Sequence, residues 1–203
     1  MPQLVARTQT PIGAVDTYNA LAGACSFGRE GLLVLLSQIW LETGSGASCF
    51  NFNLGGIKST GGSDGFDWFQ SQTQEGSGGS AVTITALFRA YDSLDAGAAD
   101  FVHLLQSRFA AAWAAAQTGD TGAYAQALHD GGYYTASETD YAAGLATRYA
   151  QLDPQIPAGA PNRGLGVALK VGAILAVSAG AAWWLLDPRA VKRTFQSLKG
   201  AFA

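Results

Sequence analysis

Glu42 is the residue of this sequence whose surroundings best suit acid chemistry. It ends the apolar run LLVLLSQIWLE and is followed by TGSG, a short segment with two glycines. A carboxylate between apolar side chains and an open loop is poorly solvated, which raises its pKa and lets it donate a proton near neutral pH. The alternative is a glutamate simply exposed at a helix end, although the negative end of the helix dipole gives a carboxylate no stabilisation there. The immediate sequence leaves both interpretations open.

Further motifs follow Glu42 along the chain and narrow this choice. In order, they are NLGGIKS at Asn53–Ser59, TQE at Thr73–Glu75, FRAY at Phe88–Tyr91 and GYYT at Gly132–Thr135. Together with LETGSGAS, these segments resemble the glucosaminidase family of bacterial autolysins and flagellar cell-wall hydrolases, glycoside hydrolase family 73. The resemblance runs from about residue 12 to residue 152.

The sequence departs from the family pattern at two positions. Ser45 stands where the family often has Trp, and Gly55 stands where it has Phe. Both departures remove aromatic surface near the expected cleft, and such surface could stack on sugar rings.

The resemblance implies an α+β fold that is mainly α and lysozyme-like, with a helical lobe, a small β-hairpin lobe and a cleft between them. It implies a peptidoglycan hydrolase that cleaves the β-1,4 glycosidic bond after N-acetylglucosamine in cell-wall glycan strands. No metal or organic cofactor is implied, because two carboxylates and water suffice for this reaction. A muramidase or lytic transglycosylase on the same fold is one alternative. An inactive cell-wall-binding or structural membrane protein is another.

By the same resemblance, Glu42 is the general acid and Glu75 is the second carboxylate, carried on the hairpin. Glu75 would activate a water molecule on the opposite face of the sugar. Inversion requires about 6.5–9.5 Å between two such groups, and retention requires about 5–5.5 Å. From its own sequence, at the start of EGSGGS, Glu75 would be a solvated turn residue, so its catalytic role depends on the resemblance.

Four other residues are expected to contact the substrate. Tyr133 would take part in catalysis by orienting the substrate or its N-acetyl group, although Tyr134 follows directly and a packed aromatic is the alternative. Asn53 would bind the sugar or cap its own loop. Lys58 would meet a carboxylate of the muramic acid unit or remain solvated.

Hydrophobic periodicity predicts the elements that position these residues. The alternating residues of FDWFQSQTQ and AVTITALF on either side of EGSGGS predict a two-stranded hairpin inserted after the second helix. Arg89 and Tyr91 are expected to hold this hairpin to the helical body. Helices are predicted at residues 11–24, 27–42, 93–116 (as one or two), 120–130 and 138–152.

The C-terminal part of the sequence differs from the rest. The catalytic domain is expected at residues 1–152, followed by a Pro-rich linker at 153–163. Residues 164–186 contain one charge, Lys170, which predicts a transmembrane helix rather than a buried core helix. Residues 187–203 interleave basic and apolar side chains, a pattern typical of a basic amphipathic helix on an anionic lipid surface.

Charge is divided in the same way. Residues 1–162 contain six Lys or Arg and fourteen Asp or Glu. Residues 163–203 contain six Lys or Arg but only one Asp. The acidic body argues against nucleic acid as a partner. The basic tail is expected in the cytoplasm, which places the anchored catalytic domain outside it, in the periplasm.

The N-terminal residues affect the expected localisation. They have no basic flank before an apolar core, so no secretory signal is expected. A membrane-containing virion would explain how the domain crosses a membrane. The chain would then be a phage lytic protein that opens the cell wall locally, and a host protein that remodels the wall is the alternative. The expected partners are therefore peptidoglycan strands, the lipid bilayer and a membrane or virion complex.

The cysteines and histidines indicate no metal site. Cys25 and Cys49 lack metal-ligand spacing, and the helix predicted between them favours free thiols over a disulfide. His103 and His129 have no ligand partner at i+4 and are expected in the core or at the surface.

Overall fold

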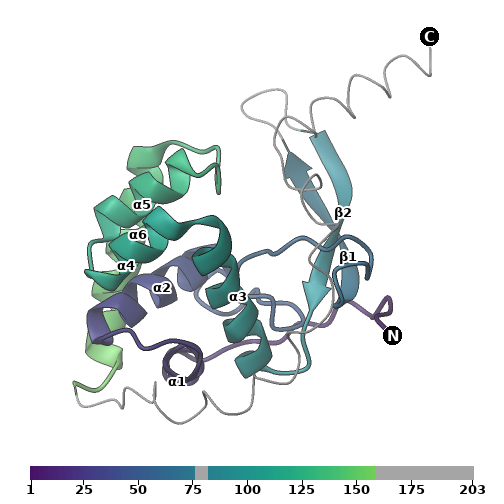
Figure 1. Ribbon diagram of the computed structural model, residues 1–203, viewed down its shortest axis with the longest axis horizontal. Coiled ribbons are helices and arrows are strands. Elements are labelled where there is room, and N and C mark those ends of the chain that lie inside the picture. Colours follow the sequence, from purple (N-terminus) through teal and green to yellow (C-terminus); the bar gives the residue numbers. More distant parts are fainter. Residues whose placement is uncertain (76–81, 159–203) are drawn as a thin grey trace. The chain divides into compact units, whose positions relative to one another are not determined.

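The computed structural model describes residues 1–75 and 82–158 of the 203-residue chain (Figure 1). The chain divides into two units, Met1–Val167 and Ala168–Ala203, and all described residues belong to the first. The predicted transmembrane helix at 164–186 and the basic tail at 187–203 lie outside the described residues and stay predictions. Within the part of the chain that is described, no helix is both long and apolar enough to cross a membrane.

The helical body is organised around one buried helix, α2. A helix that is apolar around its whole circumference is buried on all sides, and every residue of α2 from Gly31 to Trp40 is buried. Helices α1, α4 and α6 pack against it. The helices are α1 (Ala14–Ala24), α2 (Arg29–Glu42), α3 (Leu94–Arg108), α4 (Ala110–Gln117), α5 (Thr121–Asp130) and α6 (Glu138–Leu152).

The predicted helices are confirmed, with small shifts at their starts. Residues 138–152 are helical as predicted, and the 93–116 segment forms two helices separated at Phe109. The first helix begins at Ala14 rather than at residue 11, because the backbone before it pairs with the loop after α2. Ile12 N, for example, donates to Gly46 O at 3.1 Å.

The hairpin is confirmed as an antiparallel pair, β1 (Asp67–Glu75) and β2 (Val82–Ala90), inserted after α2. A two-stranded hairpin is marginally stable alone, and here other segments pair with it. Val5 N donates to Trp68 O at 2.8 Å, and Trp68 N donates to Gln3 O at 3.1 Å. The N-terminal segment therefore supports the hairpin along the base of β1 (Figure 1).

A partly buried ion pair joins the hairpin to the helical body, as predicted for Arg89 and Tyr91. Arg89 Nη1 contacts Asp100 Oδ2 on α3 at 2.8 Å, and Tyr91 Oη donates to the same oxygen at 2.6 Å. Arg89 Nε also contacts Asp64 Oδ2 at 3.0 Å. This joint holds the hairpin at a defined place beside α3.

The folded body extends past residue 152 into the predicted linker. The helical turn η2 (Asp153–Gln155) follows α6, and Ile156 is buried against the core. Arg29 at the start of α2 contacts Asp153 Oδ1 at 2.6 Å and donates to Ile156 O at 2.9 Å. The first residues after 152 are thus fixed to α2.

Candidate active site

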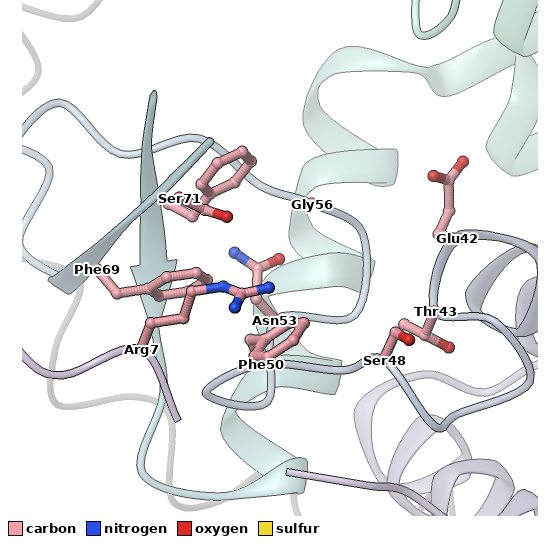
Figure 2. A pocket seen from close by; sticks show the side chains of 10 residues that line it. Arg7, Glu42, Thr43, Ser48, Phe50, Asn53, Gly56, Phe69 and Ser71 are labelled. Atoms are coloured by element: carbon pink, nitrogen blue, oxygen red, sulfur yellow. The ribbon is translucent and has the colours of Figure 1, made fainter. Parts of the chain in front are cut away.

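A pocket of about 160 Å³ opens between the end of α2 and the hairpin (Figure 2). Four segments contribute side chains to it: the N-terminal segment, the end of α2, the loop after α2 and the hairpin. Its lining residues are Arg7, Glu42, Thr43, Ser48, Phe50, Asn53, Gly56, Phe69, Ser71 and Phe88.

The end of α2 is fixed by a tight turn that places Glu42 at the pocket. Thr43 Oγ1 donates to the helix carbonyl one turn earlier at 2.6 Å and accepts from Gly46 N at 3.1 Å. Residues Gly44–Gly46 all have positive φ, the conformation that glycine adopts most readily. A Cβ at Gly46 would lie 2.4 Å from Ile12 O, so only glycine fits there. Gly46 is therefore required by the turn, and Gly44 adopts its positive φ at less cost than a residue with a side chain.

Glu42 is exposed to solvent as a whole residue, although many protein atoms lie close around its carboxyl at the edge of the pocket. Burial raises the pKa of Glu42, and a hydrogen bond from Tyr141 Oη, 2.9 Å from Oε1, opposes this in part. Burial and the charge of Glu42 raise the pKa of Tyr141 far above that of a free tyrosine, so Tyr141 remains a donor. The predicted raised pKa is confirmed in direction, and its cause is burial as expected.

Tyr141 is a site residue that the sequence did not indicate. It lies in the first turn of α6, 99 positions from Glu42 in the sequence. Tyr134 stacks on it, with ring centroids 3.9 Å apart and planes at 16°. Tyr134 Oη donates to Ala125 O at 2.9 Å. Tyr134, predicted to bind substrate, therefore supports Tyr141 and is not among the described residues that line the pocket.

Tyr133 lies close to Glu42 but is packed into the body. Its Oη donates to Gly55 O at 3.0 Å, and its ring meets Phe109 edge-on at 5.3 Å. Burial, followed by the charge of Glu42, raises the pKa of Tyr133 strongly, so it stays protonated. Tyr133 therefore has the packing role that the sequence offered as the alternative to catalysis. It still lies near enough to Glu42 for the charge of Glu42 to raise its pKa.

Gly55, one of the two departures from the family pattern, has a structural reason. A Cβ at this position would lie 2.9 Å from Phe101 Cδ2 and 3.2 Å from Tyr133 Oη. Phe101 is fully buried, so it cannot move aside without cost. A phenylalanine at position 55 has no room in this packing.

Asn53 caps its loop, the second of its two predicted roles. Its Nδ2 donates to Ile57 O and Arg89 O, both at 2.9 Å, and its Oδ1 accepts from Ile57 N at 2.8 Å. Both amide hydrogens are used within the protein, so little hydrogen-bonding capacity remains for a sugar. Asn53 shapes the pocket wall by holding the loop to β2.

Lys58 lies on an element beside the pocket but is not among the described residues that line it. Lys58 is exposed, and its backbone pairs with Phe88 of β2. Glu75 is the last residue of β1, opposite Val82, rather than a turn residue, and its side chain lies outside the described part. Position 75 is four residues beyond Ser71, which corresponds to roughly 13 Å along a strand.

Three phenylalanines that the sequence did not single out supply the aromatic surface of the pocket. Phe50 comes from the loop after α2, and Phe69 and Phe88 come from paired positions of the hairpin. The rings of Phe69 and Phe88 lie 5.7 Å apart in a stacked arrangement. The alternation of β1 is the available signal, since it places Phe69 and Ser71 on one face. The loss of aromatic surface expected from Ser45 and Gly55 is therefore offset.

The cysteines and histidines are not among the described residues that line the pocket. Cys25 and Cys49 are buried free thiols, as predicted, and His103 and His129 are exposed. In residues 1–75 and 82–158, no three His, Cys, Asp or Glu side chains form a group that could hold a metal ion.

Known proteins share this architecture. The model of the glucosaminidase family, described as mannosyl-glycoprotein endo-beta-N-acetylglucosaminidase, matches residues 30–154. A peptidoglycan hydrolase mutant from Sphingomonas sp. A1 is 27% identical, with a TM-score of 0.56 over 70% of this chain and 93% of that chain. The peptidoglycan hydrolase from the same organism is 26% identical, with a TM-score of 0.54 over 73% of this chain and 94% of that chain.

A C-terminally truncated glycoside hydrolase domain of FlgJ from Salmonella typhimurium is 25% identical, with a TM-score of 0.48 over 70% of this chain and 93% of that chain. No curated protein matches the chain. The observed fold, mainly helical with one small two-stranded sheet in its described part, is the lysozyme-like fold that the resemblance implied. Because the family model matches more than half of its residues, the chain belongs to the glucosaminidase family of glycoside hydrolases.

Proposed function

We propose that this chain is a peptidoglycan hydrolase of the endo-β-N-acetylglucosaminidase type, with Glu42 as its general acid. The observation that carries the proposal is a carboxyl of raised pKa at the edge of a pocket walled by aromatic rings. The substrate is supported by the Sphingomonas relative, which is described as a peptidoglycan hydrolase.

In the proposed reaction, Glu42 donates its proton to the glycosidic oxygen as the bond from that oxygen to the sugar C1 breaks. Burial raises the pKa of Glu42 and so favours its protonated form, because it disfavours the charged form. Tyr141 Oη then donates to the carboxylate that remains, which limits the cost of the charge. The phenylalanines form the apolar wall of the pocket beside the sugars, while positive charge develops at C1 in the transition state.

Glu75 is proposed as the base that removes a proton from the attacking water. The motif TQE supports this role, and the even spacing of position 75 from Ser71 is the spacing of residues on one strand face. Its position toward the far end of β1 requires the hairpin to bend toward Glu42 when glycan binds. Such closure is common where an enzyme encloses its substrate.

A muramidase or lytic transglycosylase is the second candidate. Glu42 is the one acidic residue among the described residues that line the pocket, and a transglycosylase requires only one acid. In that reaction, a hydroxyl of the substrate displaces the leaving group and gives an anhydro sugar in place of a hydrolysed end.

Digestion of purified peptidoglycan, read by mass spectrometry, tests both candidates. The full chain should release products with reducing N-acetylglucosamine ends, and Glu42→Gln should release none. Reducing or anhydro N-acetylmuramic acid ends would move the reaction to the second candidate. Intact glycan that stays bound to both proteins would indicate an inactive cell-wall-binding protein.

Membrane anchoring is proposed from sequence alone. The apolar composition of 164–186 and the basic residues of 187–203 support an anchor with the catalytic domain outside the cytoplasm or in a membrane-containing virion. Flotation with lipid vesicles should be lost when 164–186 is deleted. Unchanged flotation would refute the anchor.

A further inference from the structure

One wall of the pocket comes from a segment outside the family match. Arg7 lines the pocket together with Glu42, whereas the family match begins at residue 30. The Arg7 guanidinium lies over the ring of Phe50, with Cζ 3.3 Å from the ring centroid (Figure 2). Arg7 and Glu42 are the charged residues of the described pocket lining. The N-terminal segment thus adds a cation to the wall facing the proposed acid.

Backbone pairing on both sides of Arg7 fixes its position. On one side, Val5 N donates to Trp68 O of β1 at 2.8 Å. On the other side, Asn51 N donates to Thr8 O at 2.8 Å, and Thr8 N donates to Asn51 Oδ1 at 2.9 Å. Arg7 is therefore held between the hairpin and the loop after α2, which form two walls of the pocket.

The guanidinium of Arg7 remains available to an anion. Arg7 is exposed, and it forms no ion pair with any residue of the described part. Contact of a guanidinium with an aromatic ring leaves its in-plane N–H donors free. Those donors match the two oxygens of a carboxylate, which Arg binds in a bidentate manner.

We propose that Arg7 is a specificity-determining residue that binds a carboxylate carried by the glycan near the bond that Glu42 protonates. This inference rests on the proposed function, since the glycan comes from it. Peptidoglycan offers two sources of such a carboxylate. One is the lactyl group of a muramic acid unit without peptide, and the other is the acidic residues of the stem peptide. Polymers of N-acetylglucosamine alone have neither, so Arg7 distinguishes peptidoglycan from neutral glycans.

The test measures binding in the full chain with Glu42→Gln, so that the ligand is not consumed. Arg7→Met keeps an unbranched side chain over Phe50 but removes the charge. Arg148→Met removes a partly exposed arginine on α6 that contacts Gln151, and it serves as the matched control. The three ligands are peptide-free glycan strands, strands with stem peptides, and a neutral N-acetylglucosamine oligomer.

Arg7→Met should weaken binding of a carboxylate-bearing strand about tenfold and leave affinity for the neutral oligomer unchanged. Weaker binding of peptide-free strands assigns the lactyl carboxylate, and weaker binding of stem-bearing strands alone assigns the peptide. Arg148→Met should change none of the three. Three outcomes would overturn the proposal. Arg7→Met could weaken the binding of all three ligands equally, or it could weaken the binding of neither acidic strand. The parent Glu42→Gln chain could also fail to bind acidic strands at all.

Two further measurements separate this inference from folding and from catalysis. If Arg7→Met lowers the melting temperature, Arg7→Lys keeps the charge without the bidentate geometry, and it should give intermediate affinity for the acidic strand alone. Wild-type hydrolysis is measured separately. A chain that binds acidic strands through Arg7 but releases no product refutes the proposed activity alone, whereas hydrolysis with binding independent of Arg7 refutes this inference alone.

Discussion

The two sides of the pocket are built in different ways. Glu42 stands at the end of α2, a helix buried along most of its length, and contacts Tyr141 of α6. The opposite side is a two-stranded hairpin held by the Arg89–Asp100 pair and by backbone pairing with the N-terminal segment. The proton donor is therefore fixed by the core, whereas the surfaces that would meet the glycan depend on a few contacts at the base of the hairpin.

The largest effect is expected on the helical side. Glu42→Gln keeps the size of the side chain but removes the acid, so kcat/KM on peptidoglycan should fall about a thousandfold. Glu30→Gln changes an exposed residue at the other end of α2 and should leave the rate unchanged. A Glu42→Gln enzyme that kept about a tenth of the activity or more would remove Glu42 from the role of general acid.

Glu75→Gln tests whether the hairpin contributes to the chemistry. Loss of the proposed base should lower kcat about a hundredfold while the melting temperature stays that of the wild type. Wild-type activity in this variant, together with anhydro products, would show that one acid suffices and would favour the transglycosylase.

Arg89→Met should weaken the attachment of the hairpin. The change leaves Asp100, which is nearly buried, without its cation and should lower the free energy of unfolding by about 2 kcal/mol. Denaturant unfolding measures the loss, and hydrogen exchange should accelerate in β1 and β2 more than in α2. If hydrogen exchange instead accelerated equally in the hairpin and in α2, the Arg89–Asp100 ion pair would not be what specifically holds the hairpin.

Tyr141→Phe should have the smallest effect, about tenfold on kcat/KM, with a diagnostic change in pH dependence. The Tyr141 hydrogen bond stabilises the charged carboxylate, so its removal raises the pKa of Glu42 further. A general acid is active when protonated, and activity falls as pH rises through its pKa. The alkaline limb of the pH–rate profile should therefore move to higher pH.

Tyr149→Phe, on the same helix, is the control for this change. Its profile should match that of the wild type. A limb that moves to lower pH in Tyr141→Phe, or that does not move at all, would mean that Tyr141 does not act on the ionisation of Glu42.

Local patterns in the sequence were sufficient to predict the helices, the hairpin and the place of Glu42 at the end of a buried helix. The apolar run before Glu42 and the glycines after it are adjacent in sequence, and the alternation of β1 and β2 needs no distant partner. Tyr141 could not be found in this way, because its contact with Glu42 depends on how α6 packs against α2.

Arg7 could not be predicted for a similar reason. The N-terminal segment joins the fold through isolated backbone bridges, which leave no hydrophobic period in the sequence. For Asn53, the sequence predicts either sugar binding or loop capping, and only the structure shows that its amide is used within its own loop.

Direct titration of Glu42 by carbon-13 NMR of its carboxyl group, assigned with Glu42→Gln, tests the central claim most directly. The account predicts a midpoint above the ordinary value of about 4.3 for glutamate, because the walls of the pocket exclude water from the charged form. A midpoint at or below that ordinary value would show a carboxylate that is charged at neutral pH, and it would contradict the assignment of Glu42 as the proton donor.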